Sequence, residues 1–207
     1  MIIIFGASGG IGKELFKYYK NNENECIGTY YSNDSADLIK LDISNLSNLE
    51  KFSCNIDINK KINIINCTGI TDLTPLHKSD YESWKKIIDV NIIGAYNILK
   101  TFLPIMRKNE YGKLIHFGSI VTEKPVYGSS AYITSKDAIK GLSKSVNHEN
   151  IKHNIKSTVI NLGYSELGMI KKVPEKIKEN IIQNSKYNRL CSKEEIISMV
   201  DDILNDK

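Results

Sequence analysis

The chain has 207 residues, of which 41% are hydrophobic and 25% are charged. This mixture is typical of a single globular domain with a full hydrophobic core, and it leaves little room for a second independent domain. The formal net charge of +4 at pH 7 is mild, and the lysines are scattered among glutamates and asparagines, which argues against a nucleic-acid partner.

The chain opens with an apolar run at residues 2–5, which we predict to form a buried strand. The run breaks at Gly6, too early for the core of a signal peptide and far too early for a membrane span. No later run reaches spanning length either. We therefore expect a cytoplasmic protein without a membrane partner.

Five further apolar runs are predicted as strands, and segments of helical periodicity lie between them. The strands are expected at residues 26–31, 38–42, 62–67, 113–118 and 155–162, and the helices at 11–21, 46–53, 80–103 and 130–148. Two more helices are expected within residues 175–205. Continuous apolar strands that alternate with helices predict a doubly wound α/β fold, a parallel sheet with helices on both faces in a single domain 1–207.

A glycine-rich segment, GASGGIG at residues 6–12, links the first strand to the first helix. Glycines in this position permit a sharp turn and bring backbone N–H groups to a pyrophosphate at the positive end of the helix. We therefore predict a dinucleotide-binding loop. The glycines fit two patterns, because Gly6, Gly10 and Gly12 form G-x-x-x-G-x-G whereas Gly6, Gly9 and Gly12 form G-x-x-G-x-x-G.

The spacing Tyr-x-x-x-Lys, which some carbonyl-reducing enzymes use for a proton donor and its activator, occurs three times. The pairs are Tyr81 with Lys85, Tyr96 with Lys100 and Tyr132 with Lys136. A Lys one helical turn after a Tyr lies on the same helix face, and its charge is expected to lower the phenol pKa from about 10. The chain is rich in both residue types, so chance explains part of the pattern.

The first glycine pattern resembles that of the short-chain dehydrogenase/reductase family in its compact form, and the second that of longer nucleotide-sugar relatives. Those relatives carry a substrate domain of about a hundred extra residues, for which this chain has no room. The resemblance covers residues 1–163. It implies a Rossmann-like sheet of about six strands in the order 3-2-1-4-5-6 and an NAD(P)-dependent oxidoreductase that acts on a carbonyl or alcohol carbon.

The family places a Ser thirteen residues before the catalytic Tyr, at the end of the preceding strand. The matching positions are Thr68 for Tyr81, Ser83 for Tyr96 and Ser119 for Tyr132. Ser83 and Tyr96 share one predicted helix, in which thirteen residues at about 1.5 Å each hold them roughly 20 Å apart. Ser119 instead follows a strand, and the next loop returns Tyr132 to the carboxyl edge of the sheet, so only this pair is expected to converge.

The resemblance assigns four catalytic roles. Tyr132 is the general acid/base, Lys136 tunes it and holds the ribose, and Ser119 orients the substrate oxygen. Asn91 lies in VNIIG, which resembles the Val-Asn-x-x-Gly stretch of the family, and would hold a water that links Lys136 to solvent.

The resemblance also implies cofactor contacts along the chain. They are Gly6, Ser8, Gly10, Ile11, Gly12, Ser32, Asn33, Asp42, Ile43, Asn66, Cys67, Gly69, Tyr132, Lys136 and Gly163. Asp42 matches an aspartate that contacts the adenine amino group, although a turn role is the alternative. No Asp or Glu occupies the end of the second strand, where Ser32 and Asn33 are suited to a phosphate, so NADP is favoured over NAD. Against this, Gly9 stands where a basic residue is frequent.

Three departures from the family pattern concern the first strand and the C-terminal part. Phe5 replaces a Thr, Leu162 replaces the Pro of a Pro-Gly pair, and Leu167 stands where a Thr contacts the nicotinamide carboxamide. Residues 164–207 form a shortened substrate loop and helical tail without the closing strand. We therefore expect a homodimer through helices 80–103 and 130–148, and a small or open pocket. That pocket would be lined by Ile120, Tyr127 and Tyr164.

Two other functions stay open. A non-catalytic NAD(P)-binding regulator or scaffold would share this fold, and a nucleotide-sugar epimerase or dehydratase would suit the second glycine pattern. For a reductase, a 3-oxoacyl thioester, a sugar or polyol ketone and a small carbonyl compound all suit the same residues. The cysteines and histidines have neither C-x-x-C nor H-x-x-x-H spacing, so no metal site is expected.

Overall fold

A single parallel sheet organises the molecule. The computed structural model describes residues 1–22, 24–33, 35–168, 170, 175–183 and 188–206. Within these residues six strands pair in the order β3-β2-β1-β4-β5-β6, all parallel. They are β1 (Ile2–Phe5), β2 (Cys26–Tyr30), β3 (Ile39–Lys40), β4 (Asn63–Asn66), β5 (Gly112–Ser119) and β6 (Ile155–Leu162). The strand order predicted from the sequence is confirmed.

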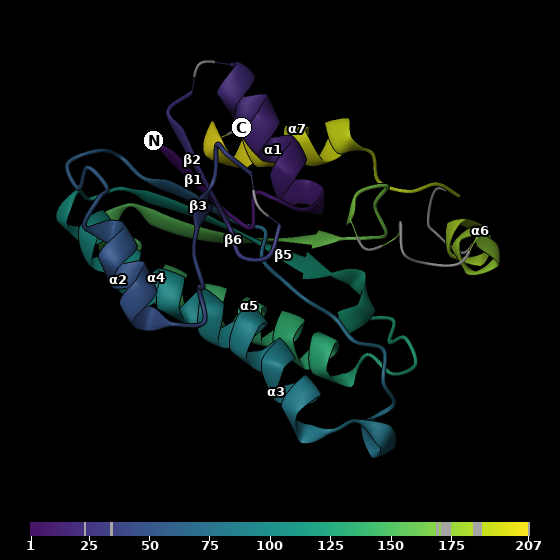
Figure 1. Ribbon diagram of the computed structural model, residues 1–207. Coiled ribbons are helices and arrows are strands. Elements are labelled where there is room, and N and C mark those ends of the chain that lie inside the picture. The colour runs from purple at the N-terminus through teal and green to yellow at the C-terminus, as the bar shows by residue number, and fades with distance from the viewer. Residues whose placement is uncertain (23, 34, 169, 171–174, 184–187, 207) are drawn as a thin grey trace.

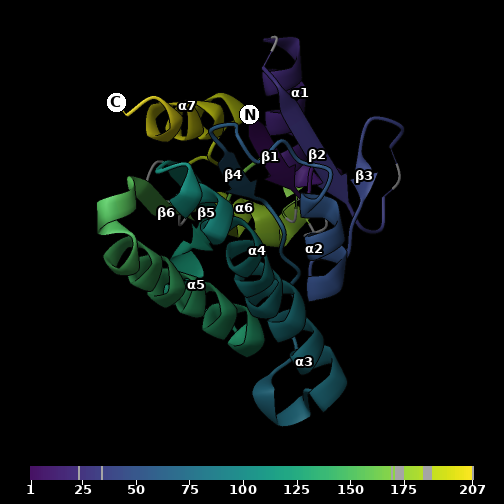
Figure 2. The same ribbon diagram turned by 90° about the vertical axis from the view of Figure 1, so that its left-hand side faces the viewer.

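Helices cover both faces of the sheet (Figure 1 and Figure 2). One face carries α1 (Gly10–Asn21) and α7 (Lys193–Leu204), and the other carries α2 (Leu46–Ser53), α4 (Gly94–Lys108) and α5 (Ser130–Glu149). Helix α3 (Tyr81–Ile88) continues into α4 through a π-helical turn (Asp89–Ile93), and α6 (Glu175–Gln183) lies beyond the carboxyl ends of the strands. Single 3₁₀ turns occur at Leu76–Lys78, Ile120–Thr122 and Ile151–His153.

The hydrophobic core has two layers because successive strand residues point to opposite faces of the sheet. In β1, Ile2 and Ile4 pack with α1 and α7, whereas Ile3 and Phe5 pack with α2 and α4. The Phe5 ring meets the rings of Phe52 and Phe102 edge to face, with centroids 6.1 and 6.0 Å apart. Each such pair stabilises the fold by about 0.5–1.5 kcal/mol beyond the contribution of the buried area. This packing explains why a Phe is accommodated where the family has a Thr.

Two elements differ from their predicted form. Residues 38–42 were expected to form a strand, but only Ile39 and Lys40 pair with β2 and both are exposed. The strand ends there because Asp42 closes a turn with Ser44. Helix 80–103 extends to Lys108, and its middle is a π-helical turn. A π turn opens the helix by one residue and is frequent at functional sites.

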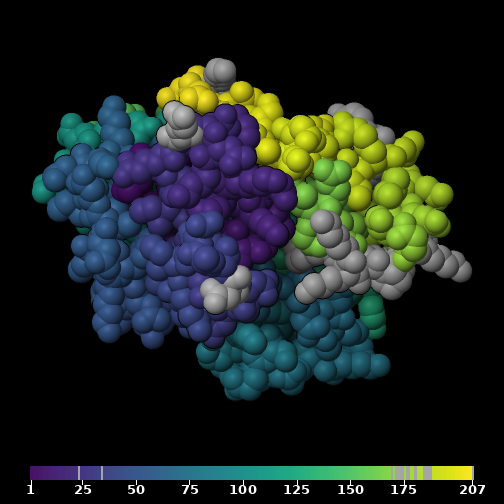
Figure 3. Space-filling model, turned by 45° about the horizontal axis from the view of Figure 1, so that its top comes forward, coloured from purple at the N-terminus to yellow at the C-terminus, as the bar shows by residue number. Residues whose placement is uncertain are grey.

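Polar contacts attach the C-terminal helix α7 to the rest of the molecule. Tyr18 and Tyr19 on α1 both donate to the Asp201 carboxylate, at 2.7 and 2.6 Å. Lys113 on β5 is buried and donates to the carbonyls of Ile203 and Leu204, at 3.2 and 2.7 Å, and so closes the end of α7. In the space-filling view, α7 lies beside α1 on this side of the molecule (Figure 3).

We expect Asp201→Ala to lower the free energy of unfolding by about 1–3 kcal/mol, because the buried Tyr19 hydroxyl loses its acceptor. Denaturant unfolding followed by circular dichroism measures this change. Asp202→Ala is the matched control, since Asp202 is the exposed neighbour on the same helix and its removal should cost less than about 0.5 kcal/mol. Equal effects of the two substitutions would contradict the anchoring role.

Candidate active site

The glycine loop joins β1 to α1 at the carboxyl edge of the sheet. A Cβ atom on Gly12 would lie 2.3 Å from the carbonyl oxygen of Gly6, so only glycine fits there, and Gly10 has a positive φ of 42°. Gly9 has an extended backbone, and a Cβ there would meet nothing within 4 Å. The structure therefore requires glycine at the positions of the first glycine pattern, and it does not require one at Gly9.

The loop leaves the start of α1 suited to an anion. Within the described part of the chain, no side chain caps the N-terminus of α1, and the first turn of α1 contains no acidic residue. Unpaired N–H groups and the helix dipole favour a negatively charged group at such an end. Ser8 and Ile11 flank this turn and are half-buried. The residues present thus fit the pyrophosphate of a dinucleotide.

Asp42 and Ile43 follow β3 at the same edge. One Asp42 carboxylate oxygen accepts from the backbone N–H and the hydroxyl of Ser44, at 2.9 and 2.6 Å, so the residue forms the turn that the sequence left as an alternative role. Asn97 on α4 donates to the carbonyls of Ile43 and Ser44, at 2.9 and 3.0 Å. The sequence analysis did not identify Asn97, whose only signal is a polar residue on an otherwise apolar helix face.

Ser32 and Asn33 lie past the end of β2 and are exposed. Their side chains are therefore accessible to a ligand that occupies this edge of the sheet.

The end of β4 and the loop after it contain three of the expected cofactor contacts, of which Asn66 is turned inwards. Its carboxamide oxygen accepts from the N–H and hydroxyl of Thr68, at 3.1 and 2.5 Å, and its nitrogen lies 3.4 Å from His116 Nδ1. Burial lowers the pKa of His116 to about 4, so the ring is neutral at pH 7. The Asn66 side chain is thus engaged in bracing the loop and is buried away from a ligand.

Cys67 and Gly69 lie closer to the site. Burial raises the pKa of the Cys67 thiol, and its side chain packs against the glycine loop, 3.1 Å from where a Cβ of Gly12 would stand. A Cβ on Gly69 would lie 3.4 Å from Lys136 Nζ and 3.6 Å from Asn91 Oδ1. The backbone at Gly69 therefore lies directly beside the predicted catalytic residues.

Ser119, Tyr132 and Lys136 converge at the ends of β5 and α5. Ser119 is the last residue of β5, and Tyr132 and Lys136 lie on one face of α5. All three are buried. The Ser119 side chain lies near enough to the Tyr132 hydroxyl to lower the pKa of that phenol, and its oxygen accepts from the N–H of Val121 at 3.3 Å. The pair selected from the sequence is therefore brought together by the fold.

The Lys136 ammonium lies between β5 and the Tyr132 ring. It donates to the carbonyl of Phe117 at 2.8 Å and lies 5.5 Å from the centre of the Tyr132 ring. Burial lowers the pKa of Lys136 to about 8. Burial also raises the pKa of Tyr132, while the Ser119 hydrogen bond acts in the opposite direction. The net direction for Tyr132 in this structure is therefore upward, and the role of Lys136 in tuning Tyr132 stays a prediction.

Asn91 lies in the π-helical turn between α3 and α4. Its side chain accepts from the N–H of Ile70 at 2.9 Å, and donates to the carbonyl of Ile70 at 3.0 Å and to the hydroxyl of Ser135 at 2.9 Å. Its side-chain amide is therefore engaged with protein groups. Ser135 was not identified from the sequence, although it lies inside the quoted AYITSK segment.

The two competing Tyr-Lys pairs lie at the surface. Tyr81 is 71% exposed and Tyr96 is 47% exposed. Lys85 pairs with Asp89 on its own helix, and Thr68 is bonded to Asn66. The structure thus offers neither pair a second donor in a buried site.

The expected substrate residues are only partly brought together. Ile120 and Tyr164 are half-buried near Gly163, whose Cβ position is 3.8 Å from Ile120 Cδ1, and burial raises the pKa of Tyr164. Tyr127 is 78% exposed, so it does not line an enclosed pocket. Gly168 lies against Gly10, and its Cα is 3.0 Å from where a Cβ of Gly10 would stand. Part of the expected substrate loop and tail, residues 169, 171–174 and 184–187, lies outside the described residues.

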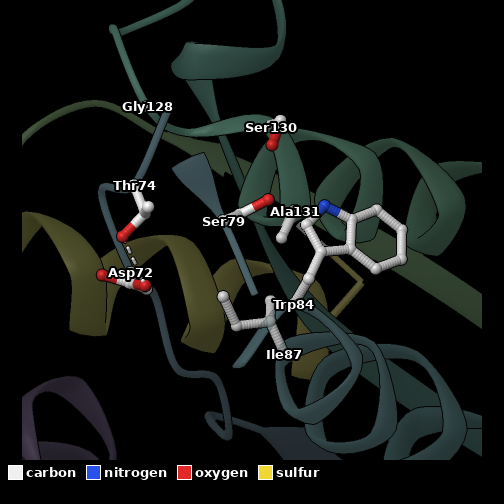
Figure 4. A pocket seen from close by; sticks show the side chains of 8 residues that line it. All are labelled: Asp72, Thr74, Ser79, Trp84, Ile87, Gly128, Ser130 and Ala131. Atoms are coloured by element: carbon white, nitrogen blue, oxygen red, sulfur yellow. Dashed lines mark hydrogen bonds between the residues drawn. The ribbon is translucent and has the colours of Figure 1, made fainter. Parts of the chain in front are cut away.

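A cavity of about 10 Å³ lies beside the first turn of α5, between the loop after β4 and α3 (Figure 4). Its volume corresponds to about one water molecule. The Trp84 indole N–H faces this region, and its nitrogen is buried without a hydrogen-bond partner among the described residues. The cavity is too small for a substrate and concerns only the packing of Tyr132's helix.

Among the described residues, no group of three or more His, Cys, Asp or Glu side chains is placed to hold a metal ion. None of the helices that the structure describes combines the length and apolar character needed to cross a membrane.

Comparison with known proteins identifies the family. The family model for short chain dehydrogenases matches residues 1–178. The 3-oxoacyl-(acyl-carrier-protein) reductase FabG of Rickettsia felis is 28% identical, over 99% of this chain and 89% of its own length. The acetoacetyl-CoA reductase of Shinella zoogloeoides is 25% identical, over 99% and 90%.

Among solved structures, the ligand-free aldohexose dehydrogenase of Thermoplasma acidophilum has a similar fold. The TM-score is 0.87 at 22% sequence identity, and the match covers 98% of this chain and 86% of that one. The glycine loop, the strand order and the matched family model agree, and the chain is a member of the short-chain dehydrogenase family of NAD(P)-dependent oxidoreductases.

Proposed function

We propose that this protein reduces a carbonyl group with Tyr132 as the proton donor. The observation that carries the proposal is the buried contact between Ser119 and Tyr132, with Lys136 beside them, at the carboxyl edge of the sheet. Ligands of open α/β sheets bind at this edge. A non-catalytic regulator would not need these three side chains to converge.

The chemistry divides between the cofactor and the protein. A nicotinamide, when bound, supplies the hydride. Ser119 holds the substrate oxygen and Tyr132 transfers its proton to that oxygen, a general-acid contribution of about 10²–10⁴ in rate. In the oxidative direction, Tyr132 accepts the proton instead.

Lys136 keeps a positive charge close to the reacting proton. Its pKa of about 8 leaves the ammonium mostly charged at neutral pH, so it favours a phenolate on Tyr132 when the proton has left. We also propose that Lys136 binds a ribose hydroxyl of the cofactor. The turn that contains Asn91 and the adjoining backbone at Gly69 border the ammonium, and we propose this side as the route by which a water resupplies the proton.

We propose a 3-oxoacyl thioester as the substrate class. The support is similarity in sequence, because the relatives that align over nearly the whole chain are named as reductases of 3-oxoacyl-(acyl-carrier-protein) and acetoacetyl-CoA. The side chains of Ile120, which follows Ser119, and of Tyr164 are half-buried and largely apolar, and are compatible with an acyl group. A sugar ketone is the second candidate within the same reaction class.

NADP is the proposed cofactor. Ser32 and Asn33 are exposed past the end of β2 and can donate hydrogen bonds to a 2′-phosphate, whereas neither carries a charge that would repel it. The chain offers no basic side chain at Gly9, so we expect the preference over NAD to be modest.

We also propose a homodimer through the helical segments 80–103 and 130–148. Ile93 and Tyr96 are large apolar side chains that are 40% and 47% exposed on the first of these segments. A cytoplasmic location is part of the proposal, since Cys26, Cys54, Cys67 and Cys191 are all free thiols.

Replacement of Tyr132 by Phe should reduce turnover of acetoacetyl-CoA about 10²–10⁴-fold and leave cofactor binding intact, because only the proton donor is lost. Steady-state kinetics and NADPH fluorescence titration measure the two properties. Tyr81→Phe removes the same hydroxyl from an exposed Tyr-x-x-x-Lys pair and should have no effect. Near-normal turnover of the Tyr132 variant would sink the assignment, and cofactor binding without turnover of any carbonyl by the natural chain would favour the regulator.

Gly9→Arg should raise the affinity for NADPH about tenfold and leave that for NADH unchanged, since an Arg side chain fits the open space at Gly9 and a guanidinium binds phosphate well. Asn33→Asp should shift the preference in the opposite direction by placing a carboxylate near the 2′-phosphate. Fluorescence titration with both cofactors compares the variants. If neither substitution changes the ratio of the two affinities, the proposed 2′-phosphate position is wrong.

Tyr96→Glu should convert the dimer into a monomer, because it places a charge in the proposed apolar interface. Sedimentation velocity gives the molecular mass in solution. Tyr127→Glu, at an exposed position outside both helices, is the control and should remain dimeric. A monomeric natural chain would refute the proposed assembly.

A further inference from the structure

The hydroxyl of Ser135 connects two parts of the candidate site. Ser135 is fully buried on α5, one residue before Lys136. Its oxygen accepts a hydrogen bond from Asn91 Nδ2 at 2.9 Å, and its proton is donated to the carbonyl of Tyr132 at 2.7 Å. A helical Ser commonly donates to a carbonyl in the preceding turn, but here the same oxygen also receives a donor from another helix.

Asn91 extends this connection to the loop after β4. Its amide pairs with both the N–H and the carbonyl of Ile70, at 2.9 and 3.0 Å. Ile70 follows Gly69, whose backbone borders the Lys136 ammonium. Three segments that are far apart in sequence therefore meet at one buried amide: the loop after β4, the π-helical turn and the first turns of α5.

Every polar atom of the Asn91 side-chain amide has a hydrogen-bond partner. Of its two N–H groups, one bonds Ile70 and the other bonds Ser135, while its oxygen accepts from Ile70. If the Ser135 hydroxyl is removed, one buried donor of Asn91 loses its partner, and the amide is then held by Ile70 alone. The start of α5, which carries Tyr132, then loses its polar connection to the π-helical turn.

We propose that Ser135 is a positioning residue. Its hydrogen bond to Asn91 attaches α5 to the π-helical turn and so keeps Tyr132 beside Ser119. Ser135 is not a catalytic residue, because its hydroxyl is occupied by protein groups and does not reach a substrate. The inference rests on the proposed function, in which Tyr132 is the proton donor. Its effect should appear in the rate of proton transfer, since small misplacements of a reacting group have large kinetic costs.

Ser143 provides a matched control on the same helix. It is also buried, and its hydroxyl donates to the carbonyl of Ser157 at 3.0 Å and contacts the Ser157 hydroxyl at 2.8 Å. These bonds attach α5 to β6, at a position eleven residues after Tyr132. Ser143→Ala therefore removes a buried hydroxyl from the same helix without touching the contacts to Asn91.

The test compares Ser135→Ala with Ser143→Ala in the full chain. Both variants should lose similar thermal stability. Only Ser135→Ala should lower kcat for acetoacetyl-CoA, by about tenfold, with KM and the NADPH affinity unchanged. Amide hydrogen exchange of the ligand-free protein gives a readout that is independent of turnover, and the Ile70 amide should exchange faster in Ser135→Ala than in Ser143→Ala.

A double substitution tests whether Ser135 acts through Asn91. If it does, Asn91→Ala combined with Ser135→Ala should reduce kcat no further than Asn91→Ala alone, whereas independent effects would multiply. Equal kcat values and equal Ile70 exchange for Ser135→Ala and Ser143→Ala would overturn the proposal. Tyr132→Phe separates this outcome from a failure of the proposed function: loss of turnover in that variant with no effect of Ser135→Ala refutes only the positioning role.

Discussion

Burial of the Lys136 ammonium is the constraint on which the rest of the candidate site depends. A cation that is taken out of water carries a large free-energy cost unless hydrogen-bond acceptors replace the water. The Phe117 carbonyl is such an acceptor, and it belongs to β5 rather than to the helix that carries the lysine. Helix α5 therefore cannot slide along the sheet without leaving a buried charge unpaired. This fixes the place at which Tyr132 meets Ser119.

The fold was largely predictable because the central strands β1, β4 and β5 are almost wholly buried. Residues 2–5 and 155–162 stand out as short apolar runs, and their observed bounds agree with the predicted ones. The convergence of Ser119 with Tyr132 was also predictable, since it follows from the common carboxyl edge of parallel strands. The sequence pattern is therefore enough to predict which residues lie at the carboxyl edge of the sheet.

The hydrogen-bond partners within the site were not predictable in the same way. The sequence pattern does not reveal the π turn at Asn91, because residues 80–103 have the apolar spacing of one continuous helix. Nothing along the chain indicates that Lys136 bonds Phe117, or that Ser135 accepts from Asn91, because these contacts depend on how helices seat on the sheet. The outward position of Tyr127 and the shortness of β3 are likewise set by loop packing.

The attachment of α7 to α1 bears on how the chain reaches this structure during synthesis. Tyr18 and Asp201 are 183 residues apart, so their contact closes almost the whole chain into one loop. The first strand and helix leave the ribosome early. The apolar face that contains Ile4 and Leu15 is covered by Ile196 and Val200 only after α7 has been synthesised. Contacts of such long range slow folding. The cofactor-binding half of the molecule is thus the first to be made and the last to be completed.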